Sequence, residues 1–145
     1  MSRWITEQVR PLQTSLTESW REQAACTSAD PDLFYDGTPV HIGDVEIRAH
    51  HTPGHCPGEV CLEVREQGAR ETHLFVGDSL FAGSIGRTDL PGGNYEVLMQ
   101  SITKVIMGFG DDAIVHPGHG PDTTVRRERT RNPFVLEYLS GRARS

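Results

Sequence analysis

The sequence is poor in lysine, has no long apolar run and contains no histidine before residue 41. Lysine occurs once, at Lys104, among 14 basic residues, and 20 acidic residues bring the net charge to −6. A nucleic-acid-binding protein needs a basic stripe, which this balance does not supply. No apolar stretch approaches the roughly 20 residues that cross a bilayer. We therefore expect neither a nucleic acid nor a membrane as partner.

Cysteine is also scarce, since Cys26, Cys56 and Cys61 are the three in the chain. Three cysteines form no disulfide framework, and the first residues lack the apolar segment of a secretory signal. The expected localisation is therefore the cytoplasm, where thiols stay reduced. A length of 145 residues is enough for one domain with a core of its own.

Glycine and proline, by contrast, gather around three short motifs. Each motif places a possible metal ligand where a strand would end and a loop would begin. The motifs are His51-Thr52-Pro53-Gly54-His55, Gly77-Asp78-Ser79-Leu80-Phe81 and Pro117-Gly118-His119-Gly120. Two imidazoles and one carboxylate are a common ligand set for zinc or iron. The sequence therefore predicts that His55, Asp78 and His119 bind a metal.

Hydrophobic periodicity and turn residues predict strands first, and then strands that alternate with helices. The predicted strands cover 38–41, 45–50, 60–64, 73–76 and 113–115, and the predicted helices cover 4–25, 95–107, 124–131 and 133–139. This order favours a sheet with helices packed on one face. The three candidate ligands fall just past strand ends, so one sheet would bring them to a common edge.

Each candidate ligand also has a simpler interpretation. His55 and His119 would be ordinary loop histidines, and Asp78 would be a turn or helix-capping aspartate. The three residues in this order favour metal binding over those alternatives. Elsewhere, we expect His41 and His73 on the surface, and Cys61 and Glu63 on the outward side of their strand.

The three motifs, with the glycine-rich segment 83–93 between the second and third, resemble the metallo-β-lactamase superfamily. Within it, the short bacterial glyoxalase II-like (hydroxyacylglutathione hydrolase-like) enzymes are similar over about residues 36–135, including the tail 120–134. The resemblance implies a mixed α/β fold, the αββα sandwich. The chain would hold only its C-terminal portion, as a single partial domain over 1–145 with a helical N-terminal segment (1–35) and the family region (36–145).

The resemblance implies a two-metal site at one edge of the sheets. By position, His55 resembles a ligand of the first metal, Asp78 the carboxylate that bridges both, and His119 the last ligand of the second. The implied cofactor is zinc, as one or two ions, or else iron. Arg87 resembles a basic residue that helps to hold glutathione, although Asp89 replaces the aromatic residue expected two positions later.

The family's His-x-His-x-Asp-His motif, which supplies four further ligands, is absent from this sequence. We therefore expect either a fragment or a relative that lacks half of its sandwich, with reduced metal affinity and activity in this chain alone. A sheet face without a partner also promotes association, which predicts a homo-oligomer, an aggregate or a need for a missing segment.

The implied activity is hydrolysis of a small-molecule thioester of the hydroxyacylglutathione type by metal-bound hydroxide, with no catalytic side chain beyond that water. One alternative is an iron-dependent persulfide dioxygenase, which the segments 86–89 and 128–133 also resemble. The other alternative is a non-catalytic, truncated homologue.

Overall fold

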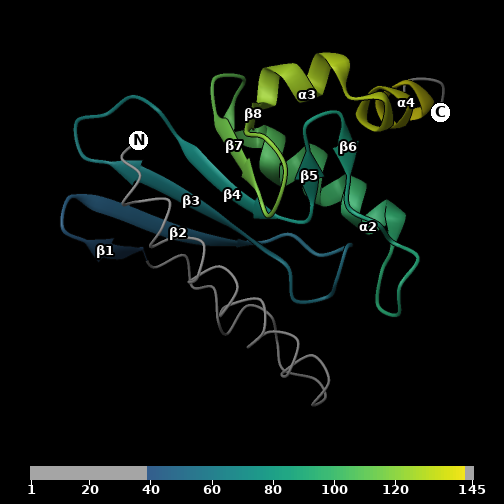
Figure 1. Ribbon diagram of the computed structural model, residues 1–145, viewed down its shortest axis with the longest axis horizontal. Helices are drawn as coiled ribbons and strands as arrows, with labels where there is room; N and C mark the ends of the chain where they lie inside the picture. Colours follow the sequence, from purple (N-terminus) through teal and green to yellow (C-terminus); the bar gives the residue numbers. More distant parts are fainter. Residues whose placement is uncertain (1–38, 143–145) are drawn as a thin grey trace.

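The computed structural model describes residues 39–142, and a six-stranded sheet is its central element (Figure 1). The strand order in the sheet is β1-β2-β3-β4-β7-β8, and β5 and β6 pair separately. The strands are β1 (Val40–Ile42), β2 (Val45–His51), β3 (Val60–Glu66), β4 (His73–Gly77), β5 (Leu80–Phe81), β6 (Ser84–Ile85), β7 (Ile114–Pro117) and β8 (Thr123–Thr124). The predicted N-terminal segment 1–35, with its helix over 4–25, lies outside the described residues.

Within residues 39–142, the helical part of the fold consists of three α-helices and two irregular turns. These elements are α2 (Tyr95–Gln100), the π-helical turn η2 (Ser101–Val105), the 3-10 turn η3 (Ile106–Phe109), α3 (Val125–Arg131) and α4 (Pro133–Arg142). Within the part of the chain that the structure describes, no helix has both the length and the apolar character needed to cross a bilayer.

The sheet topology places the motif loops at the same end of the sheet. Strands β1 to β4 are antiparallel neighbours, whereas β7 runs parallel to β4, with Gly77 opposite Pro117. The loops that follow β4 and β7 therefore leave the sheet side by side. The end of β2 joins them, because His51 pairs with Val60 at the start of β3.

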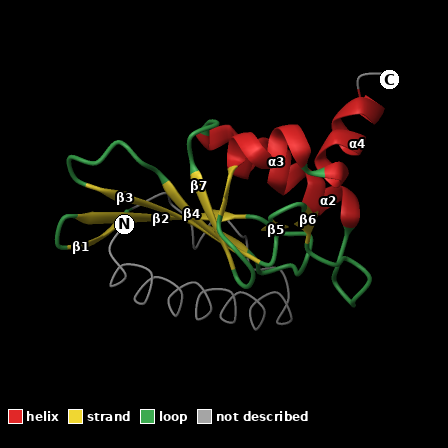
Figure 2. Cartoon of the chain, turned by 45° about the horizontal axis from the view of Figure 1, so that its top comes forward, coloured by secondary structure: helices red, strands yellow, loops and turns green. Residues whose placement is uncertain are grey.

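The helices pack on one face of the sheet, as predicted, and α3 and α4 lie on that side in Figure 2. The larger core cluster joins sheet residues to helix residues, among them Cys61, Leu74, Val76, Val115, Leu98, Ile102, Val125 and Val135. The smaller cluster lies on the opposite face and consists of Val45, Ile47, Val60, Leu62, Val64 and Phe75. Consecutive residues of a strand point to opposite faces, so β3 contributes to both clusters.

The burial of both sheet faces corrects three of our predictions. Cys61 and Glu63 are buried rather than outward, because the helical layer covers that face of β3. Burial raises the pKa of the Cys61 thiol. His73 is also buried rather than on the surface, and its Nδ1 lies 2.9 Å from Nε2 of His116.

The segment predicted as one helix over 95–107 changes its winding after six residues. Asn94 caps α2, since its side chain accepts the N–H of Val97. In the following turn, the hydroxyl of Thr103 donates to the carbonyl of Met99 at 2.7 Å. Hydroxyl bonds of this kind to the preceding turn bend helices, and here the regular helix gives way to η2 and η3.

Candidate metal centre

Asp78 lies between two imidazoles, at the end of the sheet where β4 finishes. Its Oδ2 is 3.9 Å from Nε2 of His55, and its Oδ1 is 3.4 Å from Nδ1 of His119. The two carboxylate oxygens therefore face different rings. The structure brings together the three side chains that the sequence singles out, whereas their role as metal ligands stays a prediction.

The three side chains do not enclose a single point. Among residues 39–142, no group of three or more His, Cys, Asp or Glu side chains has an arrangement that could hold a metal ion. His119 provides the open side, because its side chain is 72% exposed, compared with 14% for His55. Its ring stacks on Phe81 of β5, with the two centroids 5.0 Å apart.

The hydrogen bonding of His55 shows which of its ring nitrogens is available to bind a cation. Its Nδ1 lies 2.9 Å from the backbone carbonyl of Arg87. A carbonyl only accepts, so Nδ1 carries a proton, and Nε2 is the ring nitrogen that faces the Asp78 carboxylate, at 3.9 Å. Metal-bound histidines show the same pattern, with the second nitrogen donating to a carbonyl or carboxylate. The hydrogen bonding of His55 and the nearby carboxylate of Asp78 therefore suit metal coordination.

The His55 loop is held against α2 by hydrogen bonds from the two residues that flank this helix. The Asn94 N–H donates to the carbonyl of Gly54 at 2.8 Å, and the Ser101 hydroxyl donates to the carbonyl of Pro53 at 2.7 Å. Gly54 has φ +136°, and a Cβ there would lie 2.3 Å from backbone atoms of Leu98. The glycine before His55 is therefore required both by its backbone conformation and by the proximity of the helix.

Two further glycines approach Asp78 closely. A Cβ on Gly118 would lie 2.5 Å from Oδ1 of Asp78, and the Gly118 N–H donates to the carbonyl of Gly77 at 2.8 Å. A Cβ on Gly86 would lie 1.9 Å from the Asp78 carbonyl oxygen. The loops on both sides can reach Asp78 because these positions carry no side chain.

Glu59 is a residue of this site that the sequence analysis missed. Its side chain is buried, its Oε1 accepts the backbone N–H of Asp78 at 2.8 Å, and its Oε2 lies 3.6 Å from the thiol of Cys56. Burial raises the pKa of the Glu59 carboxyl, and the hydrogen bond from Asp78 opposes that rise. The signal in the sequence was a charged residue directly before the apolar start of β3.

Arg87 is paired within its own loop. Its guanidinium makes two hydrogen bonds of 2.8 Å to the carboxylate of Asp89, and both side chains are exposed. These hydrogen bonds lower the pKa of Asp89 to about 2. The backbone of Arg87 orients His55, while the substrate-binding role of its side chain stays a prediction.

A second buried carboxylate, Glu128, fixes the β5–β6 hairpin to α3. It accepts the N–H of Gly83 at 2.8 Å and the side-chain amide of Asn132 at 2.9 Å, as well as the hydroxyl of Thr123. The amide of Asn132 also donates to the carbonyl of Ser84. The hairpin that supplies Phe81 is therefore attached to the C-terminal helices.

Comparison with known proteins gives a consistent assignment. The Metallo-beta-lactamase superfamily profile matches residues 15–119. The hydroxyacylglutathione hydrolase GloC of Haemophilus influenzae is 37% identical over 107 residues, which are 72% of this chain and 49% of that protein. The chain spans about half the length of the curated relatives it matches.

Solved structures of similar proteins extend the comparison. ETHE1 from Myxococcus xanthus has a TM-score of 0.60 and 27% identity, over 72% of this chain and 49% of that one. The protein TTHA1623, solved in a di-iron-bound form, has a TM-score of 0.55 and 33% identity, over 86% of this chain and 62% of that one. The matched region corresponds to the C-terminal portion of the mixed α/β fold, as predicted. The chain belongs to the metallo-β-lactamase superfamily.

Proposed function

We propose that this chain is part of a metal-dependent hydrolase that cleaves thioesters of the hydroxyacylglutathione type, with His55, Asp78 and His119 as metal ligands. The observation that carries the proposal is the position of Asp78, whose two oxygens face different imidazoles at 3.9 and 3.4 Å. Two ligands of one tetrahedral zinc ion, with bonds of about 2.1 Å, lie about 3.4 Å apart. Each imidazole–carboxylate pair is therefore close to the spacing that one ion requires.

The arrangement suits a carboxylate that serves two ions better than three ligands that converge on one. Zinc and iron both accept imidazole and carboxylate ligands. When bound, such an ion lowers the pKa of water and polarises a carbonyl oxygen. The relative that was solved with two iron ions supports a site for two metals, with iron as one candidate.

The chain's own residues would orient and hold these groups. The carbonyl of Arg87 keeps Nδ1 of His55 protonated, so that Nε2 is the coordinating atom. A thiol leaving group has a pKa of about 8.5 and departs without a strong general acid. We propose that Arg87 exchanges Asp89 for a carboxylate of the thiol carrier, since an exposed ion pair of this kind is weak.

Metal binding and turnover test the proposal separately. Zinc and Fe(II) titrations by calorimetry, on the chain and on His55→Ala, would show whether the site binds metal. A panel with a hydroxyacylglutathione and the same acyl group on an uncharged thiol would then test the reaction. Saturable but weak metal binding that His55→Ala removes, with slow thioester cleavage, is the expected result, because the His-x-His-x-Asp-His motif is absent from this sequence. No binding and no cleavage would favour the non-catalytic alternative.

A persulfide dioxygenase is the second candidate, and the resemblance of the segments 86–89 and 128–133 to that group is the observation that favours it. That activity needs iron and consumes oxygen. Oxygen uptake with a persulfide substrate, in iron-loaded protein that leaves thioesters intact, would replace the hydrolase proposal.

A further inference from the structure

Glu59 connects the two loops that carry His55 and Asp78. Its carbonyl accepts the N–H of Thr52 at 2.9 Å, and its N–H donates to the carbonyl of Cys56 at 3.4 Å, so its backbone closes the loop 52–59. Its side chain reaches in the other direction, to the backbone N–H of Asp78 at 2.8 Å. One residue thus joins the His55 loop to the end of β4.

The surroundings of Glu59 differ from those of Glu63, the nearest buried carboxylate along the chain. Glu63 pairs with the guanidinium of Arg65 at 2.6 Å and with His50 at 2.9 Å. The donors to Glu59, by contrast, are a backbone N–H and a thiol. A buried carboxylate is costly unless its hydrogen bonds are satisfied, so an acid at this position indicates that the bond to Asp78 matters.

We propose that Glu59 is a positioning residue for the metal centre, which fixes Asp78 relative to the His55 loop and so sets the separation of these two side chains. This inference rests on the proposed function, because it takes His55 and Asp78 as ligands. Glu59 does not itself reach the metal; it acts through the backbone of Asp78. Residues that orient metal ligands typically change metal affinity by 10- to 100-fold when they are lost.

Three substitutions of Glu59 distinguish the effect of its side-chain length from the effect of its charge. Glu59→Ala removes the acceptor. Glu59→Gln keeps an oxygen at the same distance, and Glu59→Asp keeps the charge on a shorter side chain. Glu63→Ala is the matched control, because it removes another buried carboxylate from the same strand region without touching the Asp78 loop. Zinc affinity by calorimetry, the visible spectrum of the cobalt(II) form, and amide hydrogen exchange by NMR are the measurements.

The expected result is a loss of about 10- to 100-fold in zinc affinity for Glu59→Ala and an altered cobalt spectrum. Glu59→Gln should recover most of the affinity, Glu59→Asp should recover less, and Glu63→Ala should leave affinity unchanged. The amide of Asp78 should exchange faster in Glu59→Ala, whereas the amide of Gly118, which bonds to Gly77, should keep its rate.

Several outcomes would overturn the inference. Wild-type zinc affinity in folded Glu59→Ala would do so, as would a Glu59→Gln protein as weak as Glu59→Ala. If Glu59→Ala does not fold, a Glu59→Asp protein that binds zinc better than Glu59→Gln would overturn the inference in the same way. If the wild-type chain binds no metal, the proposed function fails. Hydrogen exchange of the Asp78 amide then decides whether Glu59 positions the Asp78 loop. An unchanged exchange rate in the Glu59 variants would reject that positioning role.

Discussion

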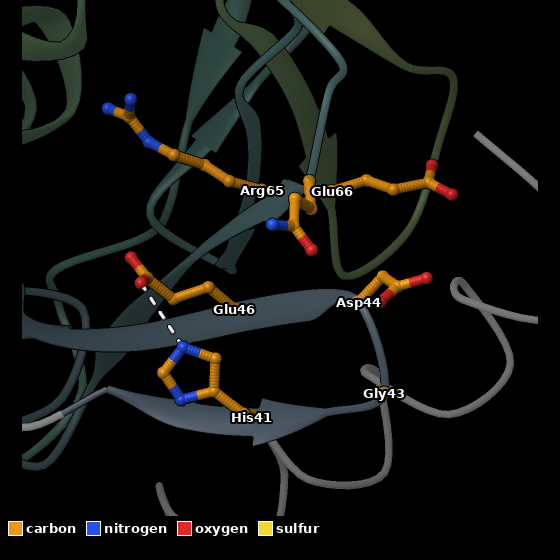
Figure 3. A pocket seen from close by; sticks show the side chains of 7 residues that line it. His41, Gly43, Asp44, Glu46, Arg65 and Glu66 are labelled. Carbon is orange, nitrogen blue, oxygen red and sulfur yellow. Dashed lines mark ion pairs between the residues drawn. The ribbon is translucent and has the colours of Figure 1, made fainter.

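The two ends of the central sheet carry the same chemical groups but differ in what surrounds them. At the end away from the motif loops, Nε2 of His41 lies 3.4 Å from Oε2 of Glu46, across the β1–β2 hairpin (Figure 3). At the motif end, His119 lies at the same distance from Asp78. The far end also has a cavity of about 300 Å³, lined by His41, Gly43, Asp44, Glu46, Arg65, Glu66 and Gln67.

The difference lies in the supporting contacts. Glu46 already accepts a hydrogen bond of 2.8 Å from the guanidinium of Arg48, and that bond lowers the pKa of its carboxyl. The side chain of His41 is 59% exposed. Asp78 instead faces two imidazoles, and a buried carboxylate holds its backbone. A histidine beside a carboxylate therefore becomes a candidate site only where the backbone around it is fixed.

The largest expected effect concerns the glycines at the two ends. Gly54→Ala should lower the free energy of unfolding by about 4 kcal/mol, because the new Cβ meets the backbone of Leu98 in a disfavoured conformation. Gly43→Ala should cost about 1 kcal/mol, since Gly43 has φ +59° and open space around it. Urea unfolding followed by circular dichroism measures both, and equal losses would show that the two ends are equally constrained.

The next effect distinguishes the histidines at the two ends by metal binding. His55→Ala should weaken zinc binding by about 100-fold or more, because a ligand is lost. His41→Ala should leave the affinity unchanged, since Arg48 already satisfies Glu46. Calorimetric titration measures both affinities, and a loss at His41 would locate a metal at the far end instead.

A smaller effect tests the close approach of the His119 loop. Gly118→Ala should lower zinc affinity by about 10-fold, because its Cβ would displace Oδ1 of Asp78. Gly108→Ala is the matched control, because that position has open space and no φ in the left-handed region. Equal zinc affinities in the two variants would mean that the β7–β8 loop yields without moving Asp78.

The smallest effect is a pH dependence at the start of β4. Burial, and then the neighbouring His116, lower the pKa of His73 from its ordinary value of 6.5. As the pH falls below 6.5, the unfolded chain therefore binds more protons at His73 than the folded chain does. The free energy of unfolding should decrease in that range. His73→Phe should flatten this slope, measured by urea unfolding at a series of pH values, whereas His41→Phe should not. An unchanged slope in His73→Phe would assign it to other groups.

The longer elements of the fold were predictable because they depend on local signals, whereas the two-residue strands β5, β6 and β8 were not predicted. Hydrophobic periodicity and turn residues predicted β2 to β4, and the helix predicted over 133–139 coincides with α4. The covered faces were not predictable in the same way. Cys61, Glu63 and His73 lie on strands whose alternation shows two faces, but not that both are buried.

The sequence alone determined which groups this protein offers for chemistry. Two imidazoles and a carboxylate stand near strand ends beside glycines, and the glycines at 54 and 118 allow close approach to Leu98 and Asp78. Only the tertiary structure decided that β7 runs parallel to β4, which brings His119 to Asp78. The same is true of Glu59, whose bond to Asp78 spans 19 residues of sequence. Contacts at that separation depend on how strands pair, and a linear pattern does not encode pairing.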